Sequence, residues 1–457
     1  MLTYDLSARG SLPRYEYLYR CLRRDILSGV LLSGTRLPSK RAFAEHLGIS
    51  VITVESAYAQ LLAEGMIESR ARRGYFAAAR ALPPPAVAAA ASEDEPPRWR
   101  LDLRSGRQDA GFFPAGIWSR LTRRVLAECP SAPLGGVPHE GLYELREAIA
   151  AYLRGEKALS VEPNQIIIGA GSEFLYLLLA QLFSGAVIAL EDPGYPKIRE
   201  VYTASGAVCV PAALDAQGVS PASLESGGAA VLHISPSHQF PTGAVTPVPR
   251  RQALLELMGR RGGYIIEDDY ASELGFAPLP LPTLSSIDRA GRVIYMNTFS
   301  QTISPGLRVS YLVLPRRLLG LWRERLGFYS CAVPSLEQHV LARFISGGYY
   351  SRHLSRLRKA CRERRSAVIS AFRAAEFAPR VEIYEPGAPL HFLMRVSTGL
   401  PDAELRRRAE ALGLRLGFLS DCAFSPRPEL EHVLLINYSS LDEKRLCEAV
   451  ELLGRII

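Results

Sequence analysis

Five short polar segments follow apolar runs between residues 165 and 308, and their residue types could bind a planar, phosphorylated ligand. The first segment, GAGSEF, starts a helix at Gly171 and Ser172, where backbone N–H groups can bind a phosphate. The second segment, EDPGYP, carries Tyr195, whose ring could stack on a planar ligand. The other three segments supply His238, Asp268, Tyr270, Thr298, Ser300, Gln301 and Arg308.

These segments therefore offer a helix start that can bind a phosphate and an aromatic side chain that can stack on a planar ligand. The Arg308 guanidinium is a planar fork that fits phosphate oxygens. For His238 a structural role and a contact with the planar ligand both stay open, because lone histidines serve either purpose. No metal site is indicated, because the seven cysteines are scattered and none forms a CxxC pair, so we expect reduced thiols.

Alternating strands and helices are expected to position these segments. QIIIGAG, AVIALED, AVLHISP, GYIIEDD and RVIYMN are short apolar runs typical of strands in a buried, parallel sheet. Polar loops at the carboxyl ends of such strands are where α/β folds bind ligands. A smaller α+β piece is expected beyond about residue 375. The sequence therefore predicts a multidomain α/β protein.

The strings EDPGYP, SHQFPTG, EDDY and SPGLR, in this order, resemble the fold-type I pyridoxal-phosphate enzymes of the aspartate aminotransferase group. The resemblance implies that Asp268 pairs with the pyridine nitrogen, Tyr270 contacts the phenolic oxygen and Tyr195 stacks on the ring. A carboxylate at that position would keep the nitrogen protonated. The resemblance assigns the phosphate to Gly171, Ser172, Thr298, Ser300 and Arg308.

Two positions depart from that pattern. Gln301 stands where the family has the lysine that forms a Schiff base with the cofactor, and an amide nitrogen is not nucleophilic. Glu173 stands where the family usually has glutamine, and its charge would oppose a phosphate dianion. Of the five lysines we expect Lys197 near the site, as a surrogate amine or, as we favour, as a cation that replaces an arginine. We therefore expect pyridoxal phosphate to bind without a covalent bond, or not to bind.

The beginning of the chain predicts a separate basic domain. Residues 11–80 carry 11 Arg or Lys and 6 Asp or Glu, so that +5 of the whole chain's +8 falls there. Helices are expected over residues 13–28, over RAFAEHLG and from a cap at Ser50, followed by a two-stranded hairpin that turns near Gly74. A helix-turn-helix of this kind can place one helix in the major groove of DNA.

The string LPSKRAFAEHLGIS and the segment after it resemble the winged helix-turn-helix of the GntR family, and the whole chain resembles the MocR/GabR regulators. We expect the DNA-binding domain at residues 11–80, a linker at 81–98 and an aminotransferase-like domain for effector binding and dimerisation at 99–457. One departure is that the apolar Val51 and Ile52 follow Ser50, where relatives often have a polar or basic residue. The expected DNA contacts are Arg36, Ser39, Lys40, Arg41, Ser50, Thr53, Arg72, Arg73 and Gly74.

These observations predict a DNA-binding transcription regulator that is not an enzyme. Its expected partners are double-stranded DNA, a small-molecule effector and a second copy of the chain, which the resemblance implies exchanges DNA-binding domains. Two alternatives remain: a working aminotransferase with an accessory DNA-binding domain, and a binding module for another small anion. The basic stretch 351–365 is expected to face solvent, with a supplementary DNA contact as its alternative. The N-terminus lacks a signal-peptide pattern and no apolar run reaches 18 residues, so we expect a cytoplasmic location and no membrane partner.

Overall fold

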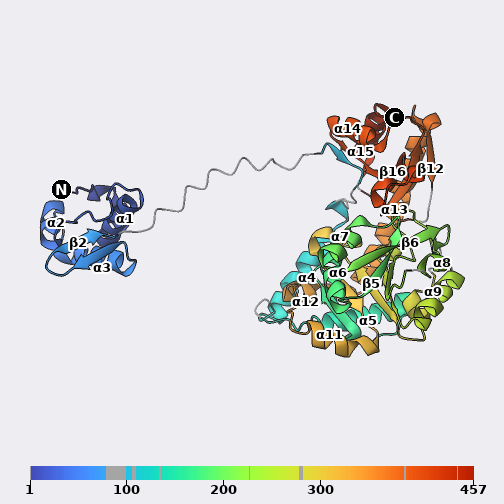
Figure 1. Ribbon diagram of the computed structural model, residues 1–457, viewed down its shortest axis with the longest axis horizontal. Coiled ribbons are helices and arrows are strands. Elements are labelled where there is room, and N and C mark those ends of the chain that lie inside the picture. Colours follow the sequence, from blue (N-terminus) through green and yellow to red (C-terminus); the bar gives the residue numbers. More distant parts are fainter. Residues whose placement is uncertain are drawn as a thin grey trace. The chain divides into compact units, whose positions relative to one another are not determined.

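The computed structural model describes residues 2–78, 99–104, 110–132, 135–225, 227–276, 281–384, 388–439 and 441–457. The chain divides into two compact units, Met1–Pro97 and Arg98–Ile457 (Figure 1). The expected linker at 81–98 lies outside the described residues. Within the described ranges, every helix is too short or too polar to cross a lipid bilayer.

Within residues 2–78, the first unit contains three α-helices followed by a two-stranded antiparallel hairpin, in the order predicted for a winged helix-turn-helix. Ser39 and Ser50 cap the second and third helices, because each hydroxyl oxygen accepts a backbone N–H at 3.2 Å from the residue three positions later. Leu22, Phe43 and Tyr58 are buried in its core. The elements are α1 (Arg14–Leu27), α2 (Lys40–Leu47), α3 (Val51–Ala63), β1 (Ile67–Arg70) and β2 (Gly74–Ala77).

An eight-stranded sheet forms the centre of the second unit, in the order β4-β11-β10-β9-β8-β5-β6-β7. The strands from β10 to β6 run parallel, whereas β11 is antiparallel to β10 and β4, and β7 is antiparallel to β6. The five apolar runs singled out in the sequence all form strands; β6, β7 and β11 were not expected. The strands are β4 (Ile166–Gly169), β5 (Val187–Asp192), β6 (Val208–Asp215), β7 (Gly218–Val219), β8 (Val231–Ile234), β9 (Tyr264–Asp268), β10 (Val293–Thr298) and β11 (Ser310–Val313).

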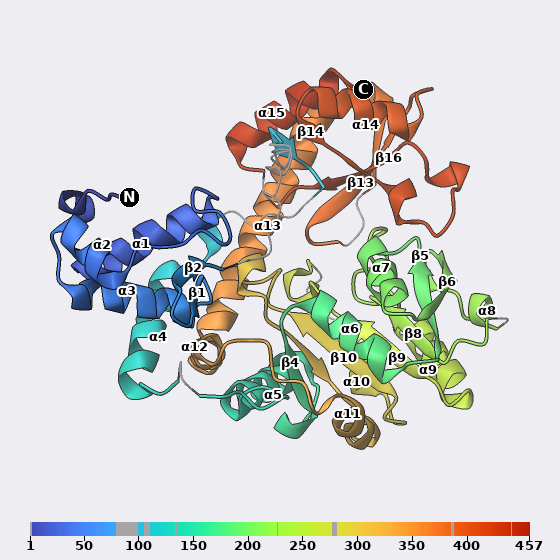
Figure 2. The same cartoon turned by 60° about the vertical axis from the view of Figure 1, so that its left-hand side comes forward.

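Helices cover both faces of this sheet (Figure 2). On the face that presents Ile266 and Ile294, the apolar sides of α6, α7 and α11 complete the core. On the other face, α5, α12 and α13 pack over β4, β10 and β11, and α9 packs over β8 and β9. These helices are α4 (Ala115–Glu128), α5 (Tyr143–Lys157), α6 (Ser172–Leu182), α7 (Pro196–Ala204), α8 (Pro221–Leu224), α9 (Val248–Arg260), α10 (Leu284–Ile287), α11 (Leu319–Leu326), α12 (Ser335–Ser346) and α13 (Tyr349–Ala374).

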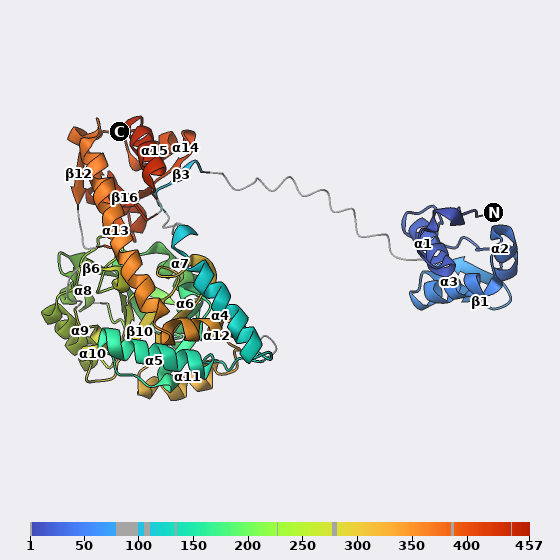
Figure 3. The same cartoon turned by 180° about the vertical axis from the view of Figure 1, so that it is seen from behind.

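A smaller antiparallel sheet, β12-β13-β16-β15, has its own apolar core, and α13 extends from the large sheet to this smaller layer (Figure 3). The strand β3 (Leu101–Asp102) pairs with β14 (Leu414–Arg415), so residues far ahead of position 375 also belong to this layer. Its other elements are β12 (Val381–Tyr384), β13 (His391–Val396), α14 (Asp402–Ala411), β15 (Gly417–Phe418), β16 (Val433–Asn437) and α15 (Glu443–Gly454).

Candidate ligand pocket and nucleic-acid interface

Asp268 lies at the carboxyl end of β9 and faces α6. Its Oδ2 accepts a hydrogen bond from the Tyr176 hydroxyl at 2.7 Å and lies 3.6 Å from Nε2 of His233. Its Oδ1 is buried and has no hydrogen-bond partner in the described part of the chain. A buried carboxylate oxygen without a partner is costly, so Oδ1 marks a position that a ligand N–H would satisfy.

Two residues that the sequence analysis did not select support Asp268 from behind. His233 lies within β8 and is buried, and its Nδ1 is 2.9 Å from the hydroxyl of Tyr202 on α7. Tyr202 therefore orients His233, which lies beside the Asp268 carboxylate without a hydrogen bond to it, while Tyr176 holds that carboxylate. The signal was a histidine inside an apolar strand, because a buried polar ring needs a partner.

The loops after β5, β8 and β9 place Tyr195, His238 and Tyr270 at the same edge of the sheet. The Tyr270 hydroxyl is buried and lacks a partner among the described residues, and burial raises the pKa of Tyr270, so it stays protonated and can donate. Burial lowers the pKa of His238 to about 4, so its imidazole is neutral at pH 7. The Tyr195 ring is 43% exposed and lies edge-on to Phe240, which leaves it accessible to a ligand.

Gly171 and Arg308 form a close contact at the N-terminus of α6. Gly171 has a φ of +91°, and a Cβ at this position would lie 2.5 Å from Nη2 of Arg308. A glycine is therefore required for the guanidinium to lie against the turn. Arg308 itself has a φ of +50°, directly after the 3₁₀ turn Pro305–Leu307. The structure thus brings together the predicted helix start and the predicted arginine, although they are 137 positions apart in the chain.

Hydroxyl groups line the strand ends beside this turn. The Ser310 hydroxyl donates to Oγ1 of Thr298 at 2.8 Å, and the Ser300 amide donates to the same oxygen at 3.1 Å. The Ser172 hydroxyl lies 3.5 Å from that of Ser310. Ser310 is buried on β11, and the sequence analysis missed it because β11 itself was not expected.

Glu173 forms ion pairs with two cations at this end of the pocket. Its Oε2 lies 3.1 Å from Nη2 of Arg308, and its Oε1 lies 3.1 Å from Nζ of Lys197. Burial alone would raise the pKa of Glu173, but the two cations outweigh that effect and lower it. An ionised carboxylate of the chain itself therefore neutralises the cations that a phosphate would use.

Gln301 lies in the turn after β10 and is partly exposed. Lys197 is a poor replacement for the missing amine, because its hydrogen bond to Glu173 raises the pKa of Lys197 and keeps the ammonium protonated. A protonated amine is not a nucleophile. The geometry supports the interpretation of Lys197 as a cation.

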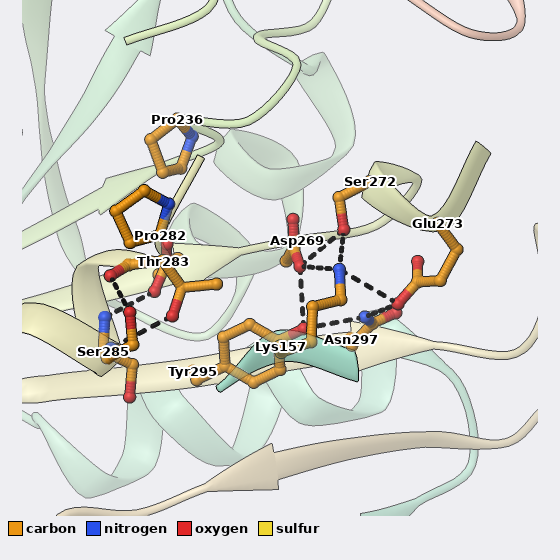
Figure 4. Close-up of polar contacts among 12 residues, drawn as sticks. Lys157, Pro236, Asp269, Ser272, Glu273, Pro282, Thr283, Ser285, Tyr295 and Asn297 are labelled. Atoms are coloured by element: carbon orange, nitrogen blue, oxygen red, sulfur yellow. Dashed lines mark hydrogen bonds and ion pairs between the residues drawn. The ribbon is translucent and has the colours of Figure 1, made fainter. Parts of the chain in front are cut away.

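A second lysine, Lys157, is buried beside Asp269, Ser272 and Glu273 (Figure 4). Since side chains alternate along a strand, Asp269 faces α5, where its Oδ2 lies 2.9 Å from the Lys157 ammonium. That ammonium also lies 3.4 Å from Oε1 of Glu273 and contacts the Ser272 hydroxyl. We call Lys157, Asp269, Ser272 and Glu273 the Lys157 cluster.

Within the Lys157 cluster, the buried positive and negative charges stabilise one another. Burial alone would lower the pKa of the Lys157 ammonium, but Asp269 and Glu273 raise it above its ordinary value. Burial would raise the pKa of Asp269, but Lys157 and the hydroxyls of Ser272 and Tyr295 lower it. The cluster therefore ties the segment that directly follows Asp268 to the end of α5.

In the first unit, the residues predicted to contact DNA differ in whether their side chains already have partners within the domain. Arg41 is exposed in the first turn of α2 and has no side-chain partner among residues 2–78. Lys40 is instead paired with Glu55 of α3 at 2.5 Å. The hydroxyls of Ser50 and Thr53 lie 2.8 Å apart at the start of α3. Lys40 thus ties α2 to α3, and Arg41 is the free cation at this end of α2.

The remaining basic residues gather at the hairpin turn, which forms the wing. Arg72 and Gly74 have positive φ angles of +60° and +102° in the turn between β1 and β2. Arg73 is exposed in the same turn. Arg36 pairs with Phe76 of β2, and its Nε would lie 3.7 Å from a Cβ at Gly74. Arg36 therefore belongs to the wing group, although it precedes α2 in the sequence.

Two further expectations concern the rest of the molecule. The basic stretch 351–365 lies within α13, which buries Leu354, Leu357 and Cys361 and leaves the Lys359 side chain 78% exposed. This amphipathic pattern is that of a solvent-facing helix. Over the residues that the structure describes, His, Cys, Asp and Glu side chains do not gather into groups of three that could hold a metal ion.

Comparisons with known proteins agree with this arrangement. The family model "Aminotransferase class I and II" matches residues 130–412, and "Bacterial regulatory proteins, gntR family" matches residues 14–76. The chain is 33% identical over 458 residues to the HTH-type transcriptional regulator YdeL of Bacillus subtilis, covering 98% of both chains. It is 31% identical over 479 residues to the "Probable rhizopine catabolism regulatory protein MocR" of Rhizobium meliloti, covering 98% of this chain and 94% of that one.

Among solved structures, the chain is similar to LysN, the alpha-aminoadipate aminotransferase of Thermus thermophilus, which is complexed with N-(5'-phosphopyridoxyl)-L-leucine. The TM-score is 0.70 at 28% identity, and the match covers 78% of this chain and 91% of that one. Aminotransferases of this fold bind pyridoxal phosphate. The second unit is thus a fold-type I aminotransferase domain that follows a DNA-binding domain, and the chain belongs to the family of MocR-like HTH-type transcriptional regulators.

Proposed function

We propose that the aminotransferase-like domain of this regulator binds pyridoxal phosphate without a covalent bond, and that it senses a small ligand instead of catalysing transamination. The observation that carries the proposal is the combination of Gln301 with a ring site that keeps a buried, unpartnered Asp268 oxygen. An amide can neither form the covalent link nor relay protons as a lysine does.

The residues at the ring end fit the cofactor. Oδ1 of Asp268 would accept a hydrogen bond from the protonated pyridine nitrogen. The Tyr270 hydroxyl would donate a hydrogen bond to the phenolic oxygen, and Tyr195 would stack on the ring. When bound, pyridoxal phosphate supplies a protonated ring that withdraws electrons. His238 is neutral and its buried Nδ1 lacks a partner in the described chain, which supports a contact close to the ring.

The residues at the phosphate end also fit the cofactor, but Glu173 already balances the positive charges of Lys197 and Arg308. Gly171, Ser172, Thr298, Ser300 and Arg308 would hold the phosphate. Glu173 would have to leave Arg308 or share it with the ligand. We therefore expect weak, reversible retention of pyridoxal phosphate, as suits a sensor that must release its ligand. Another small anion is the second candidate, because the same cations would bind inorganic phosphate.

The winged domain would bind double-stranded DNA. We infer that Arg36, Arg72 and Arg73 at the wing and Arg41 at the start of α2 contact phosphates, because these cations are exposed. Ser39, Lys40, Ser50, Thr53 and Gly74 complete the proposed interface. Lys40 and the two α3 hydroxyls also have partners within the domain, so their role is partly to set the geometry of the two helices.

A titration with pyridoxal phosphate tests the ligand proposal. We expect a change in its absorbance on mixing with the protein, full reversal on dialysis, and no mass increase after borohydride reduction. A stable adduct would contradict the non-covalent proposal and favour the alternative of a working aminotransferase. Competition by equimolar inorganic phosphate would favour the second candidate, a general anion site.

A further inference from the structure

The first turn of α3 exposes two branched apolar side chains. Val51 is 40% exposed and Ile52 is 73% exposed. The core-facing side of α3 is formed by Val54, Tyr58 and Leu61 at helical spacing, and all three are fully buried. Ile52 lies two positions before Val54, about 200° around the helix, so it points away from the core. The domain's own packing therefore does not require an isoleucine there.

The polar groups of this turn are largely used by the helix itself. The Ser50 hydroxyl oxygen accepts the Thr53 amide at 3.2 Å, and the hydroxyls of the two residues lie 2.8 Å apart. One of the two O–H groups is consequently committed to the other. The exposed apolar pair is therefore available to contact a base edge.

The exposed arginines near this turn indicate which kind of molecule binds to it. Arg41, Arg72 and Arg73 are exposed and have no acidic partner among residues 2–78. Such cations suit the phosphates on either side of a DNA groove. If these cations contact the phosphates, a helix-turn-helix of the gntR type places α3 in the major groove of B-DNA. Thymine is the base whose edge in that groove carries a methyl group, and apolar side chains contact it.

We propose that Val51 and Ile52 recognise thymine methyl groups, and that they make the regulator select sites with thymine opposite the first turn of α3. Their branched side chains are restricted at χ1, so little freedom is lost when they contact a methyl group. The apolar residues after Ser50 would then supply sequence specificity by shape and burial instead of by hydrogen bonds. This inference rests on the proposed DNA interface.

The test starts with selection of duplexes from a random library by the full-length protein. In the best duplex, each thymine is replaced in turn by deoxyuridine, which keeps base pairing and removes only the methyl group. We expect at least one replacement to weaken binding about fourfold, as for the loss of one buried methyl contact. The double variant Val51→Ala/Ile52→Ala should bind the thymine and uracil duplexes equally.

Leu32→Ala is the matched control, because Leu32 is 69% exposed and lies outside α3. This variant should keep the wild-type response to uracil, and all variants should keep the wild-type melting temperature. A wild-type protein that is indifferent to every uracil, or a double variant that keeps the response, would overturn the inference while leaving DNA binding intact. A library that yields no enriched duplex would instead contradict the DNA-binding function itself, and with it the inference.

Discussion

Glu173 and Arg308 form an ion pair of 3.1 Å across the turn at which α6 begins. The same guanidinium lies so close to Gly171 that no Cβ would fit between them. Arg308 is thus fixed against the backbone amides that would hold a phosphate, while its charge is compensated by a neighbouring carboxylate. The proposed phosphate site therefore contains a competing anion that the chain itself supplies, the carboxylate of Glu173.

Glu173→Gln should strengthen the binding of pyridoxal phosphate and of inorganic phosphate by about fivefold. An ion pair this exposed contributes at most about 1 kcal/mol, and its loss frees both Lys197 and Arg308 for the ligand. Calorimetric titration measures the change. Glu256→Gln on α9 is the control, because Glu256 is an exposed carboxylate on a helix that covers the other face of the sheet, and its removal alters the net charge equally. Equal gains in the two variants would mean that only net charge matters.

Gln301→Lys should restore a borohydride-reducible adduct with pyridoxal phosphate, since the ring site around Asp268 is intact. Combination with Glu173→Gln should raise the yield of the adduct, because the competing carboxylate is removed. Gln301→Arg is the control, since it adds a charge without a nucleophilic amine. Mass spectrometry of the reduced protein locates the adduct. An adduct on Lys197 in the unmutated chain would make Lys197 the anchoring amine and refute this account.

The strands, helices and caps were predictable because their signals are local. The caps at Ser39 and Ser50, and the strand ends that carry Asp268 and Thr298, follow from the period of apolar residues and from capping chemistry. Candidate site residues could be proposed where a short string resembles a known family. Asp268 and Arg308 are examples: Asp268 has a buried oxygen without a partner among the described residues, and Arg308 lies against Gly171, while their binding roles stay a prediction.

Contacts between distant segments could not be predicted in this way. Lys157 ends a helix whose position against Asp269 depends on how α5 packs on the sheet, 112 residues away in the chain. Arg36 joins the wing only because its segment pairs with β2. The two partners of Glu173 come from α7 and from the turn before β11. Each of these relationships is set by tertiary packing, on which a single sequence carries no periodic signal.

Lys157→Met should destabilise the second unit by about 3–5 kcal/mol, because Asp269 and Glu273 would be left buried without their cation. Lys359→Met on α13 is the matched control, since that side chain is 78% exposed, and it should change little. Thermal melting of the two variants measures the difference. A variant at Lys157 as stable as the control would show that the cluster contributes nothing to folding.

The pH dependence of stability should follow the lowered pKa of Asp269. A carboxyl group whose pKa falls on folding contributes stability above its unfolded value of 3.8 and loses that contribution as the pH falls through the folded value. The wild-type protein should therefore lose stability relative to Lys157→Met as the pH is lowered below about 4. Denaturant unfolding at several acidic pH values gives the curve. Parallel curves for the two proteins would contradict the assignment.

Arg41→Ala/Arg73→Ala should weaken DNA binding and reduce the slope of log affinity against log salt by about 2, because each lost phosphate contact releases about one counterion fewer. Arg20→Ala/Arg23→Ala removes the same charge from α1, where the two arginines are paired with Glu16 and Glu64. That control should change the slope less. Gel-shift titrations between 50 and 200 mM salt, roughly the range over which such contacts are lost, compare the variants. Equal slopes in both double variants would exclude the proposed contact surface.

The regulator should be a homodimer, because the aminotransferase-like domain belongs to a class of folds that commonly dimerise and most closed assemblies are two-fold symmetric. Two winged domains would then bind paired half-sites, so a duplex with both half-sites should bind far more tightly than one with a single half-site. Changing the spacing by about half a helical turn should weaken binding, because the second domain would face the wrong side of the duplex. Light scattering should give about twice the chain mass of 50.2 kDa. A monomer at all concentrations, or an affinity that ignores the spacing, would rule out this arrangement.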